Sequence, residues 1–160
     1  MRILLLSLIS GLLLLCSCTT SRIYVVRHAE KETQTTVSDV PLSAAGAQRA
    51  QALKDKLGNK KIDQIYSTNY VRTKATAQPL ADSKHITIAI YNPSDTSFPN
   101  RLRSQSKNIL VVGHSNTVDD LINRITMQST VPGDLPDTQY GDLFILTKKR
   151  GRFTLTRDHF

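Results

Sequence analysis

Residues 23–30 read Ile23-Tyr24-Val25-Val26-Arg27-His28-Ala29-Glu30. The β-branched and aromatic residues of the first half predict a buried strand, and Arg27 and His28 follow directly where this strand ends. In open parallel α/β sheets, ligands bind in the crevice beyond the carboxyl ends of the strands. A guanidinium and an imidazole delivered together at that edge suit an anionic ligand.

Two later stretches repeat this pattern of an apolar strand followed by a cationic or imidazole side chain. Ile65-Tyr66-Ser67 leads to Arg72, and Ile109-Leu110-Val111-Val112-Gly113 leads to His114. Because the carboxyl ends of parallel strands share one edge of a sheet, we expect Arg72 and His114 to lie beside residues 27–28.

Strands and helices alternate along the chain. The expected strands are residues 23–26, 62–67, 86–90, 109–112, and a closing hairpin of 143–147 and 153–156 joined through 148–151. The expected helices are residues 43–57, with Ser43 as N-cap and Gly58 as the stop, a helix from about 69 that Pro79 kinks or ends, and 117–127. This alternation predicts a three-layer α/β/α sandwich with a mainly parallel central sheet.

The composition fits one folded domain with an anionic partner. The chain has 160 residues, of which 39% are hydrophobic, and a formal net charge of +8. Such a charge favours phosphorylated molecules, acidic lipid head groups or nucleic acid as partners. The lysines and arginines are scattered, with no block of five or six basic residues, so nucleic-acid binding is not expected.

The first residues have the pattern of an export signal. Ile3 to Leu15 is an apolar run after a positive start, too short for an easy membrane span. It ends in Leu15-Cys16-Ser17-Cys18, which resembles the bacterial lipobox, with Cys18 as the best candidate for lipidation and Cys16 a poorer one. An ordinary secretory peptide with incidental cysteines is the alternative.

These features predict a lipoprotein signal peptide over residues 1–17, a lipidated tether over 18–22 and one domain over 23–160. The membrane would then be a partner through the lipid anchor, on the periplasmic face of the cell envelope. Thr19 carries no acidic retention signal, which favours the outer over the inner membrane.

The side chains Arg27, His28, Arg72 and His114 together suit phosphoryl chemistry. Two bidentate arginines match the oxygens of a phosphoryl group. A neutral imidazole can attack phosphorus and form a phosphohistidine, and neighbouring positive charges keep it neutral by lowering its pKa. The second imidazole can donate a hydrogen bond to the oxygens where charge develops. No metal or cofactor is expected, because the arginines supply the electrostatic stabilisation.

Three motifs resemble the histidine phosphatase superfamily, also called phosphoglycerate mutase-like, in its first branch. Residues 27–30 resemble the opening Arg-His-Gly-Glu motif, with Ala29 where glycine is more usual. Residues 66–77 resemble the segment with the second arginine, and residues 112–117 the motif with the second histidine. The resemblance spans residues 23 to about 147 in the family's order.

This resemblance implies a metal-independent phosphatase with His28 as the nucleophile. Arg27 and Arg72 would clamp the phosphate, and His114 would be the second histidine of the pocket. Asn116 would either hydrogen-bond the phosphate or cap the next helix. The short chain is closest in size to the compact phosphohistidine and sugar-phosphate phosphatases of the superfamily. Its substrate would be a phosphorylated small molecule or a phosphorylated envelope sugar.

The general acid is not evident from the sequence. Many relatives supply a carboxylate between the second arginine motif and the second histidine, where this chain has only Asp82 and Asp95 as acids. We rank Glu30 first and Asp95 second. A missing acid would favour good leaving groups, such as those of phosphohistidine or acyl phosphates.

Three alternative interpretations of these residues are open. A protein with the same fold could bind phosphate with weak or no turnover. Residues 113–117 resemble the serine-hydrolase elbow Gly-x-Ser-x-Gly, but Thr117 replaces the last glycine and the only later histidine is His159. A metal site at His28 and His114 with an aspartate lacks a recognisable ligand spacing.

Overall fold

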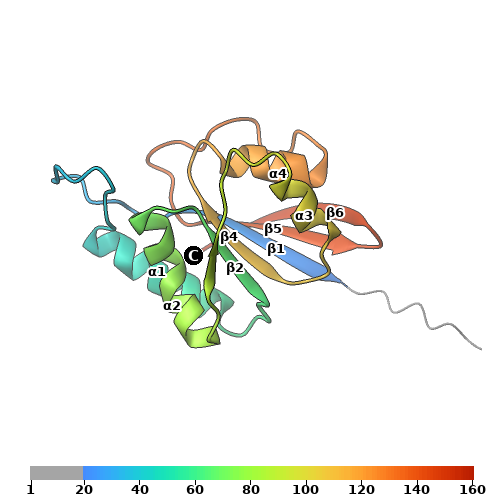
Figure 1. Cartoon of the computed structure of the whole chain (residues 1–160), viewed down its shortest axis with the longest axis horizontal. Coiled ribbons are helices and arrows are strands. Elements are labelled where there is room, and N and C mark those ends of the chain that lie inside the picture. The colour runs from blue at the N-terminus through green and yellow to red at the C-terminus, as the bar shows by residue number, and fades with distance from the viewer. Residues whose placement is uncertain (1–19) are drawn as a thin grey trace, which may run out of the picture.

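The structure is a computed structural model that describes residues 20–160, so the predicted signal peptide and Cys18 lie outside the described residues. Its centre is a six-stranded sheet in the order β3-β2-β4-β1-β5-β6 (Figure 1). The strands are β1 (Ser21–Arg27), β2 (Gln64–Ser67), β3 (Ile88–Ile90), β4 (Ile109–Gly113), β5 (Asp142–Lys149) and β6 (Arg152–His159). The helices are α1 (Ala44–Leu57), α2 (Val71–Lys84), α3 (Phe98–Ser104) and α4 (Val118–Thr126).

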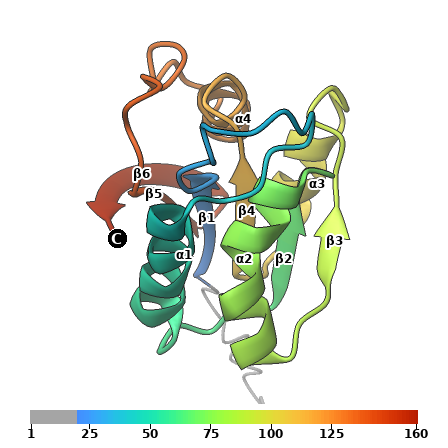
Figure 2. The ribbon, with the colours of Figure 1, turned by 90° about the vertical axis from the view of Figure 1, so that its left-hand side faces the viewer.

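The predicted sandwich is confirmed. Helices α1 and α2 cover one face of the sheet, and α3 and α4 cover the other (Figure 2). The neighbouring strands β1–β4, β2–β4 and β2–β3 pair in parallel, whereas β5 pairs with β1 and β6 in the antiparallel sense. The closing hairpin is therefore also as expected, and its two strands run to His159.

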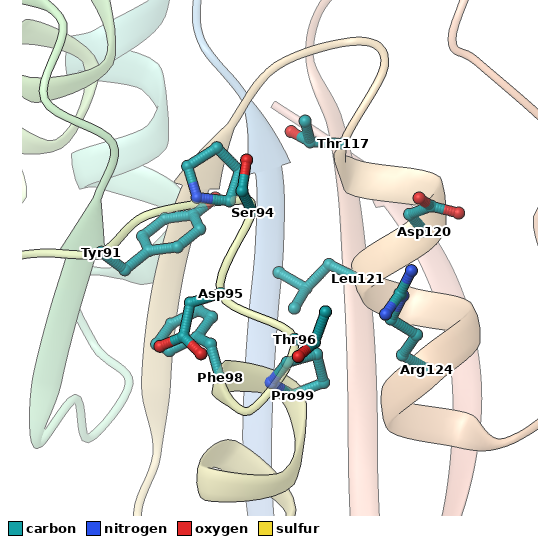
Figure 3. A pocket seen from close by; sticks show the side chains of 11 residues that line it. Tyr91, Ser94, Asp95, Thr96, Phe98, Pro99, Thr117, Asp120, Leu121 and Arg124 are labelled. Carbon is teal, nitrogen blue, oxygen red and sulfur yellow. The ribbon is translucent and has the colours of Figure 1, made fainter.

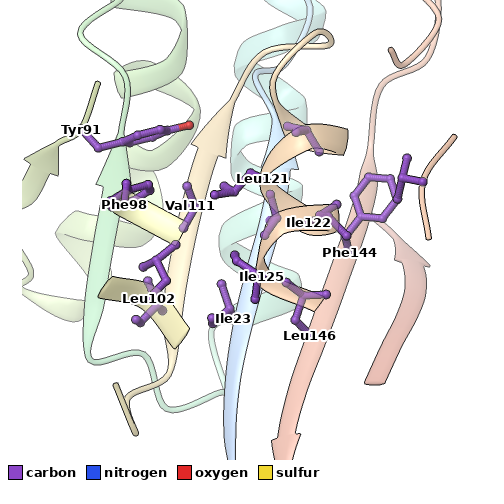
Figure 4. Packing of buried hydrophobic residues seen from close by; sticks show 14 of the residues in the cluster. Ile23, Tyr91, Phe98, Leu102, Val111, Leu121, Ile122, Ile125, Phe144 and Leu146 are labelled. Atoms are coloured by element: carbon purple, nitrogen blue, oxygen red, sulfur yellow. The ribbon is translucent and has the colours of Figure 1, made fainter. Parts of the chain in front are cut away.

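Strand β4 shows why its sequence is apolar throughout. Ile109 and Val111 point into the core formed with α3 and α4, part of which Figure 4 shows. Leu110 and Val112 point into the second core, formed with α1 and α2. All four side chains are fully buried, because a parallel strand covered by helices on both faces has no solvent-facing side.

Helix α1 begins where the sequence predicts. The hydroxyl of Ser43 accepts a hydrogen bond from the Gly46 N–H at 3.1 Å. A side chain at position 46 could not be accommodated, since a Cβ there would lie 2.1 Å from the carbonyl oxygen of Glu30. Gly46 thus lets the start of α1 pack directly against the segment that follows β1 and carries Glu30.

From the sequence we expect Pro79 to kink or end its helix, and the expectation that the helix ends there is wrong. Helix α2 continues through Pro79 to Lys84, and His85 caps it in the left-handed conformation. A proline inside a helix costs about 3 kcal/mol. Ala77, Leu80 and Ala81, on either side of it, are buried in the core against the sheet. Their burial holds the helix together past the missing N–H.

None of the helices within residues 20–160 is long and apolar enough to span a membrane.

Candidate active site

The carboxyl ends of β1 and β4 and the start of α2 bring the four predicted side chains together. They line a cavity of about 350 Å³ whose wall comprises Arg27, His28, Lys31, Tyr70, Arg72, Pro93, His114, Ser115, Asn116, Thr117 and Asp137. The rings of His28 and His114 lie 5.5 Å apart, centroid to centroid, at 67°. The register of the sheet fixes this proximity, because Arg27 pairs with Gly113 and the His28 N–H donates to the Gly113 carbonyl at 2.9 Å.

The hydrogen bond of the His28 ring defines which nitrogen can act as a nucleophile. Nδ1 lies 2.7 Å from the carbonyl oxygen of Ala29. A carbonyl oxygen can only accept, so Nδ1 carries the proton and Nε2 keeps its lone pair. Burial, joined by the charges of Arg72 and Arg27 and by His114, lowers the pKa of His28 to about 4, against the opposing effect of the Ala29 carbonyl. The ring is therefore neutral at pH 7.

His114 is fixed by a relay of two buried threonine hydroxyls. The Nε2 atom of His114 lies 2.9 Å from the Thr68 hydroxyl, which donates to the Thr73 hydroxyl at 3.0 Å. The Thr73 hydroxyl in turn lies 3.0 Å from the carbonyl oxygens of Thr68 and Tyr70. The Nδ1 atom of His114 lies 3.4 Å from a nitrogen of Arg72, which can only donate. The Nε2–H tautomer satisfies both contacts. Burial, followed by Arg72 and Arg27, lowers the pKa of His114 to about 4.

Neither threonine was singled out from the sequence, although both lie in the quoted motif of residues 66–77. The available signal was the position of Thr68 immediately after β2, at the same edge as the predicted site.

Arg27 is held by the loop that follows α4. One terminal nitrogen donates to the carbonyl oxygens of Pro136 at 2.8 Å and Gln139 at 3.1 Å. The other contacts the carboxylate of Asp137 at 3.3 Å and the hydroxyl of Tyr140 at 3.4 Å, and the guanidinium lies 4.3 Å from the centroid of the Tyr140 ring. Apart from its prolines and glycine, this loop has no sequence feature that indicates a function.

Arg72 lies in the first turn of α2, as predicted. Its guanidinium stacks 4.5 Å from the centroid of the Tyr70 ring and lies 3.8 Å from the carboxylate of Asp39, which also accepts from the Val71 N–H. Among the described residues, the buried Nε atoms of Arg72 and Arg27 have no hydrogen-bond partner. Unsatisfied buried donors are costly, and phosphoryl oxygens are the acceptors that suit two guanidinium groups.

Glu30 does not line this cavity. Its carboxylate takes three hydrogen bonds of 2.6–2.9 Å from the guanidinium of Arg49 on α1. Desolvation is the largest single effect and acts to raise the pKa of Glu30, but the hydrogen bonds from Arg49 and from its own backbone, joined by the charges of Arg49 and Arg27, together lower it. The placement of Glu30, paired and ionised, does not support the general acid role predicted for it.

The two other acids considered lie elsewhere too. Asp95 accepts from the Ser97 hydroxyl and from Arg101, and these bonds lower its pKa to about 2. Asp82 bonds Gln78 on the outer side of α2. The carboxylate that does line the cavity is Asp137, which sequence reasoning missed because it lies beyond the second histidine rather than before it.

Asn116 lines the cavity beside His114. The N-cap position of α4 belongs to Thr117, and no side chain caps the helix. The capping alternative for Asn116 is therefore not what the structure shows, and the phosphate-contact alternative keeps its geometric basis.

The rival sites gain no support. His159 lies on β6 with its Nδ1 3.9 Å from the carboxylate of Asp142, and it does not line the cavity that contains Ser115. No group of three or more histidine, cysteine, aspartate or glutamate side chains suited to a metal ion occurs within residues 20–160.

Comparison with known proteins shows the fold and a family match over part of the chain. Residues 23–92 match the sequence model of the histidine phosphatase superfamily (branch 1). No curated protein matches the chain.

Solved structures of the same fold include three phosphatases. The first, assigned as the phosphohistidine phosphatase SixA of Agrobacterium tumefaciens, has a TM-score of 0.65 at 20% identity, covering 87% of this chain and 97% of that one. The second, assigned as an alpha-ribazole-5'-P phosphatase of Escherichia coli, has a TM-score of 0.66 at 16% identity, covering 88% and 96%. The third is the phosphoserine phosphatase of Entamoeba histolytica in complex with 3-phosphoglyceric acid, with a TM-score of 0.63 at 16% identity, covering 85% and 95%.

At these identities the solved structures show the fold alone, and the family model matches the segment of residues 23–92, which carries the first two motifs. Together they support a histidine-dependent phosphatase, and residues 23–92 of the chain are similar to branch 1 of the histidine phosphatase superfamily.

Proposed function

We propose that this protein is a metal-independent phosphatase that hydrolyses a phosphomonoester or phosphoramidate through a phosphohistidine on His28. The observation that carries this proposal is the 2.7 Å contact between His28 Nδ1 and the Ala29 carbonyl. It places the proton on Nδ1 and leaves the Nε2 lone pair in a cavity that also holds Arg27 and Arg72.

The reaction would run in two displacements at phosphorus. In the first, the Nε2 lone pair forms an N–P bond as the bond from phosphorus to the leaving oxygen or nitrogen breaks, and the leaving group takes a proton from solvent. In the second, water attacks phosphorus, the N–P bond breaks, phosphate leaves with the water's oxygen, and neutral His28 is regenerated. Arg27, Arg72 and His114 would stabilise the charge on the phosphoryl oxygens in both steps.

The site has no evident proton donor for the leaving group of the substrate. Asp137, the only carboxylate among the described residues that line the cavity, is 94% exposed and contacts Arg27, so no buried acid faces the leaving group. Substrates whose leaving group departs without strong acid assistance fit best. Phosphohistidine and acyl phosphates are of this kind, and a solved structure of the same fold is assigned as a phosphohistidine phosphatase.

Turnover of acetyl phosphate and p-nitrophenyl phosphate by the purified protein tests the proposal. His28→Ala should lower kcat by more than about a thousandfold, in line with loss of a covalent nucleophile. His159→Ala is the matched control, because this exposed histidine lies outside the cavity, and it should leave kcat unchanged. Quenching with SDS at alkaline pH in the presence of ³²P-labelled substrate should trap a phosphoenzyme whose label survives base, is lost on acidification and is absent from His28→Ala.

A catalytically weak or inactive phosphate-binding protein is the second candidate. The observation that favours it is the number of protein contacts that already occupy Arg27. Phosphate binding by the wild-type protein without turnover of either substrate would establish this candidate instead.

We further propose that Cys18 is lipidated and anchors the domain at the periplasmic face of the outer membrane. The apolar run of residues 3–15 and the sequence Leu15-Cys16-Ser17-Cys18 support it. Two or more acyl chains would hold the domain stably, whereas one would not. Metabolic labelling with a fatty acid should mark the wild-type protein and not Cys18→Ala, and Cys16→Ala should keep the label.

A further inference from the structure

The edge of the sheet opposite the candidate active site is strongly basic. The parallel strands β1, β2 and β4 all begin at this edge, here called the amino edge, and the turn of the β5–β6 hairpin lies at the same end (Figure 1). The amino edge comprises residues 20–22, 58–63, 105–108 and 149–152. The lysines and arginines among these residues, all exposed, are Arg22, Lys60, Lys61, Lys107, Lys149, Arg150 and Arg152, and the acid among them is Asp63.

Hydrogen bonds between these segments make the amino edge one surface. The Arg22 N–H donates to the side-chain oxygen of Asn108 at 2.9 Å, and Asp63 and Asn108 exchange two hydrogen bonds of 2.7 and 2.8 Å. Beside the hairpin turn, the Lys148 ammonium donates to the carbonyl oxygen of Gln105 at 3.1 Å. The exposed cations therefore project from backbone segments that tertiary contacts fix side by side.

The tip of the β5–β6 hairpin holds an arginine in a backbone conformation that does not favour it. Arg150 and Gly151 both have a positive φ, of 51° and 77°, as the two central residues of a tight hairpin turn require. Glycine, asparagine and aspartate adopt this conformation readily, whereas arginine does not. The chain thus places an exposed cation at this tip in spite of a local cost, and a function of that charge accounts for the cost.

Many of the acidic side chains lie toward the opposite edge. Glu30 and Asp137 belong to the segments around the candidate active site. Asp95 and Asp120 flank a cavity between the loop of residues 91–99 and helix α4, beyond the carboxyl ends of β3 and β4 (Figure 3). The two edges therefore differ in charge, and a flat anionic surface meets the least repulsion at the amino edge.

The amino edge also carries the junction with the residues that the sequence predicts to be lipidated. Ser21, the first residue of β1, pairs with Lys148 beside the hairpin turn. Three peptide steps join Ser21 to Cys18, so these two residues lie within about 11 Å of each other. This distance is close to the Debye length of about 8–10 Å, so the cations of the amino edge come within electrostatic reach of the head groups around an anchor on Cys18.

We propose that the amino edge is a docking surface for an anionic phospholipid bilayer, with phosphatidylglycerol as the kind of lipid that it binds. The inference rests on the proposed lipidation of Cys18 only for the distance between this surface and the membrane. The lysine and arginine side chains bind the lipid phosphates, and their contributions add because the bilayer is a continuous negative surface. Strand β1 has seven residues and spans about 23 Å, so docking in this pose holds the active-site cavity away from the bilayer and open to dissolved rather than lipid-linked substrates.

Lysine labelling of the full chain on vesicles tests this pose. The chain carries Cys16→Ser and Cys18→Ser, so that no acyl chain contributes to binding. The vesicles contain phosphatidylcholine alone or with about one third phosphatidylglycerol. Because the apolar residues 3–15 are present with both kinds of vesicle, the comparison between them isolates the effect of the anionic lipid.

A membrane-impermeant acetylating reagent then reports which edge faces the lipid. Lys60, Lys107 and Lys149 should be labelled at least about threefold less on the vesicles with phosphatidylglycerol than on those without it. Lys31 and Lys74, toward the opposite edge, should keep their labelling within about 1.5-fold, because the pose leaves them in water. Unchanged labelling at the amino edge, or equal or greater protection of Lys31 and Lys74, would overturn the proposal.

Variants that remove two charges locate the contact. Lys149→Gln/Arg152→Gln, at the amino edge, should weaken binding to the phosphatidylglycerol vesicles about tenfold, in line with the loss of two cations at an anionic surface. Lys74→Gln/Arg157→Gln removes the same charge toward the opposite edge, where these side chains contact Asn69 and Asp142, and should leave binding within about twofold. An equal loss in the two variants would show an effect of net charge alone and refute the surface.

Salt and competing polyanions complete the test. The extra affinity for vesicles with phosphatidylglycerol should disappear at high salt, since exposed charges are screened. Tighter binding of duplex DNA or polyglutamate than of these vesicles at the same salt would assign the amino edge to another anionic partner and overturn the proposal.

The docking surface, the anchor and the catalytic function fail in different ways. Protection of the amino edge in a protein whose Cys18 takes no fatty-acid label keeps the docking surface and removes the anchor, and a label without protection does the reverse. Lys149→Gln/Arg152→Gln should keep the wild-type kcat on acetyl phosphate, because neither residue lines the active-site cavity. Loss of docking is therefore measured separately from loss of turnover.

Discussion

The Nδ1 atom of His28 donates a hydrogen bond to the carbonyl oxygen of the next residue, Ala29, at 2.7 Å. This contact is local, yet it determines the chemistry of the ring, because it leaves the lone pair on Nε2. Burial and two arginines then keep that lone pair unprotonated far below the usual titration range of histidine.

Activity should persist into acid. The pKa of His28 is lowered to about 4, so the ring stays neutral as the pH falls through 6.5 and protonates only near 4. After correction for the second ionisation of the phosphate ester near pH 6, kcat/KM should hold to about pH 5 and fall below it. A pH series with p-nitrophenyl phosphate checks this, and half-loss near pH 6.5 would show an unperturbed histidine instead.

Stability should depend on pH for the same reason. Between about pH 4 and 6.5 the unfolded chain binds protons at His28 and His114 that the folded chain does not. The free energy of unfolding therefore rises as the pH rises through this window and is lost as the pH falls. Thermal unfolding from pH 4 to 7 should show a shallower slope for the double variant His28→Gln/His114→Gln than for the wild type; parallel slopes would contradict the assignment.

Thr68 should matter through His114. Thr68→Val removes the hydroxyl that accepts from the Nε2–H of His114 and leaves this buried donor unpaired. The loss favours the Nδ1–H tautomer of His114, in which Nδ1–H and the Arg72 guanidinium are two donors facing each other. We expect kcat to fall about tenfold, the scale of about 1.4 kcal/mol, with little change in KM. Thr68→Ser should restore kcat, because it keeps the hydroxyl. The exposed Thr87→Val is the control, and an equal loss there would point to a general effect on folding.

Glu30 should prove structural. Glu30→Gln weakens a half-buried bidentate pair with Arg49, for which we expect a loss of about 1–2 kcal/mol and a fall in Tm of about 3–6 °C. Turnover should stay within about threefold of wild type for both good and poor leaving groups. Asp55→Asn, on the exposed side of α1, should change neither quantity. A loss of kcat confined to poor leaving groups would restore Glu30 as the general acid.

Asp137 should oppose substrate binding. Its carboxylate contacts Arg27 at the mouth of the cavity and repels an incoming dianion. Asp137→Asn should lower KM about threefold with kcat unchanged, as removal of an exposed like charge is worth below about 1 kcal/mol. The effect should shrink at high salt, since exposed charges are screened. Asp134→Asn in the same loop is the control, and a fall in kcat with Asp137→Asn would mark this carboxylate as the proton donor.

Much of the fold could be predicted because its signals are local. The run of Ile109 to Val112 can only be a strand buried on both faces, and Ser43 and Gly58 bracket α1 as expected. The convergence of Arg27, His28, Arg72 and His114 also followed, since each comes just after a strand of one parallel sheet. Pro79 misled because the burial of its neighbours, a tertiary effect, outweighs its local preference.

What the sequence by itself determined is therefore the sheet, its layers and the set of residues at one edge of it. The tertiary structure alone decided which partners these residues have. Arg49 binds the Glu30 carboxylate outside the cavity, and the loop of residues 136–140 contacts Arg27. Those partners lie 19 and about 110 residues apart in the chain. Contacts between residues so far apart in the chain depend on how helices, strands and loops pack together, and the local periodicity of the sequence does not predict them.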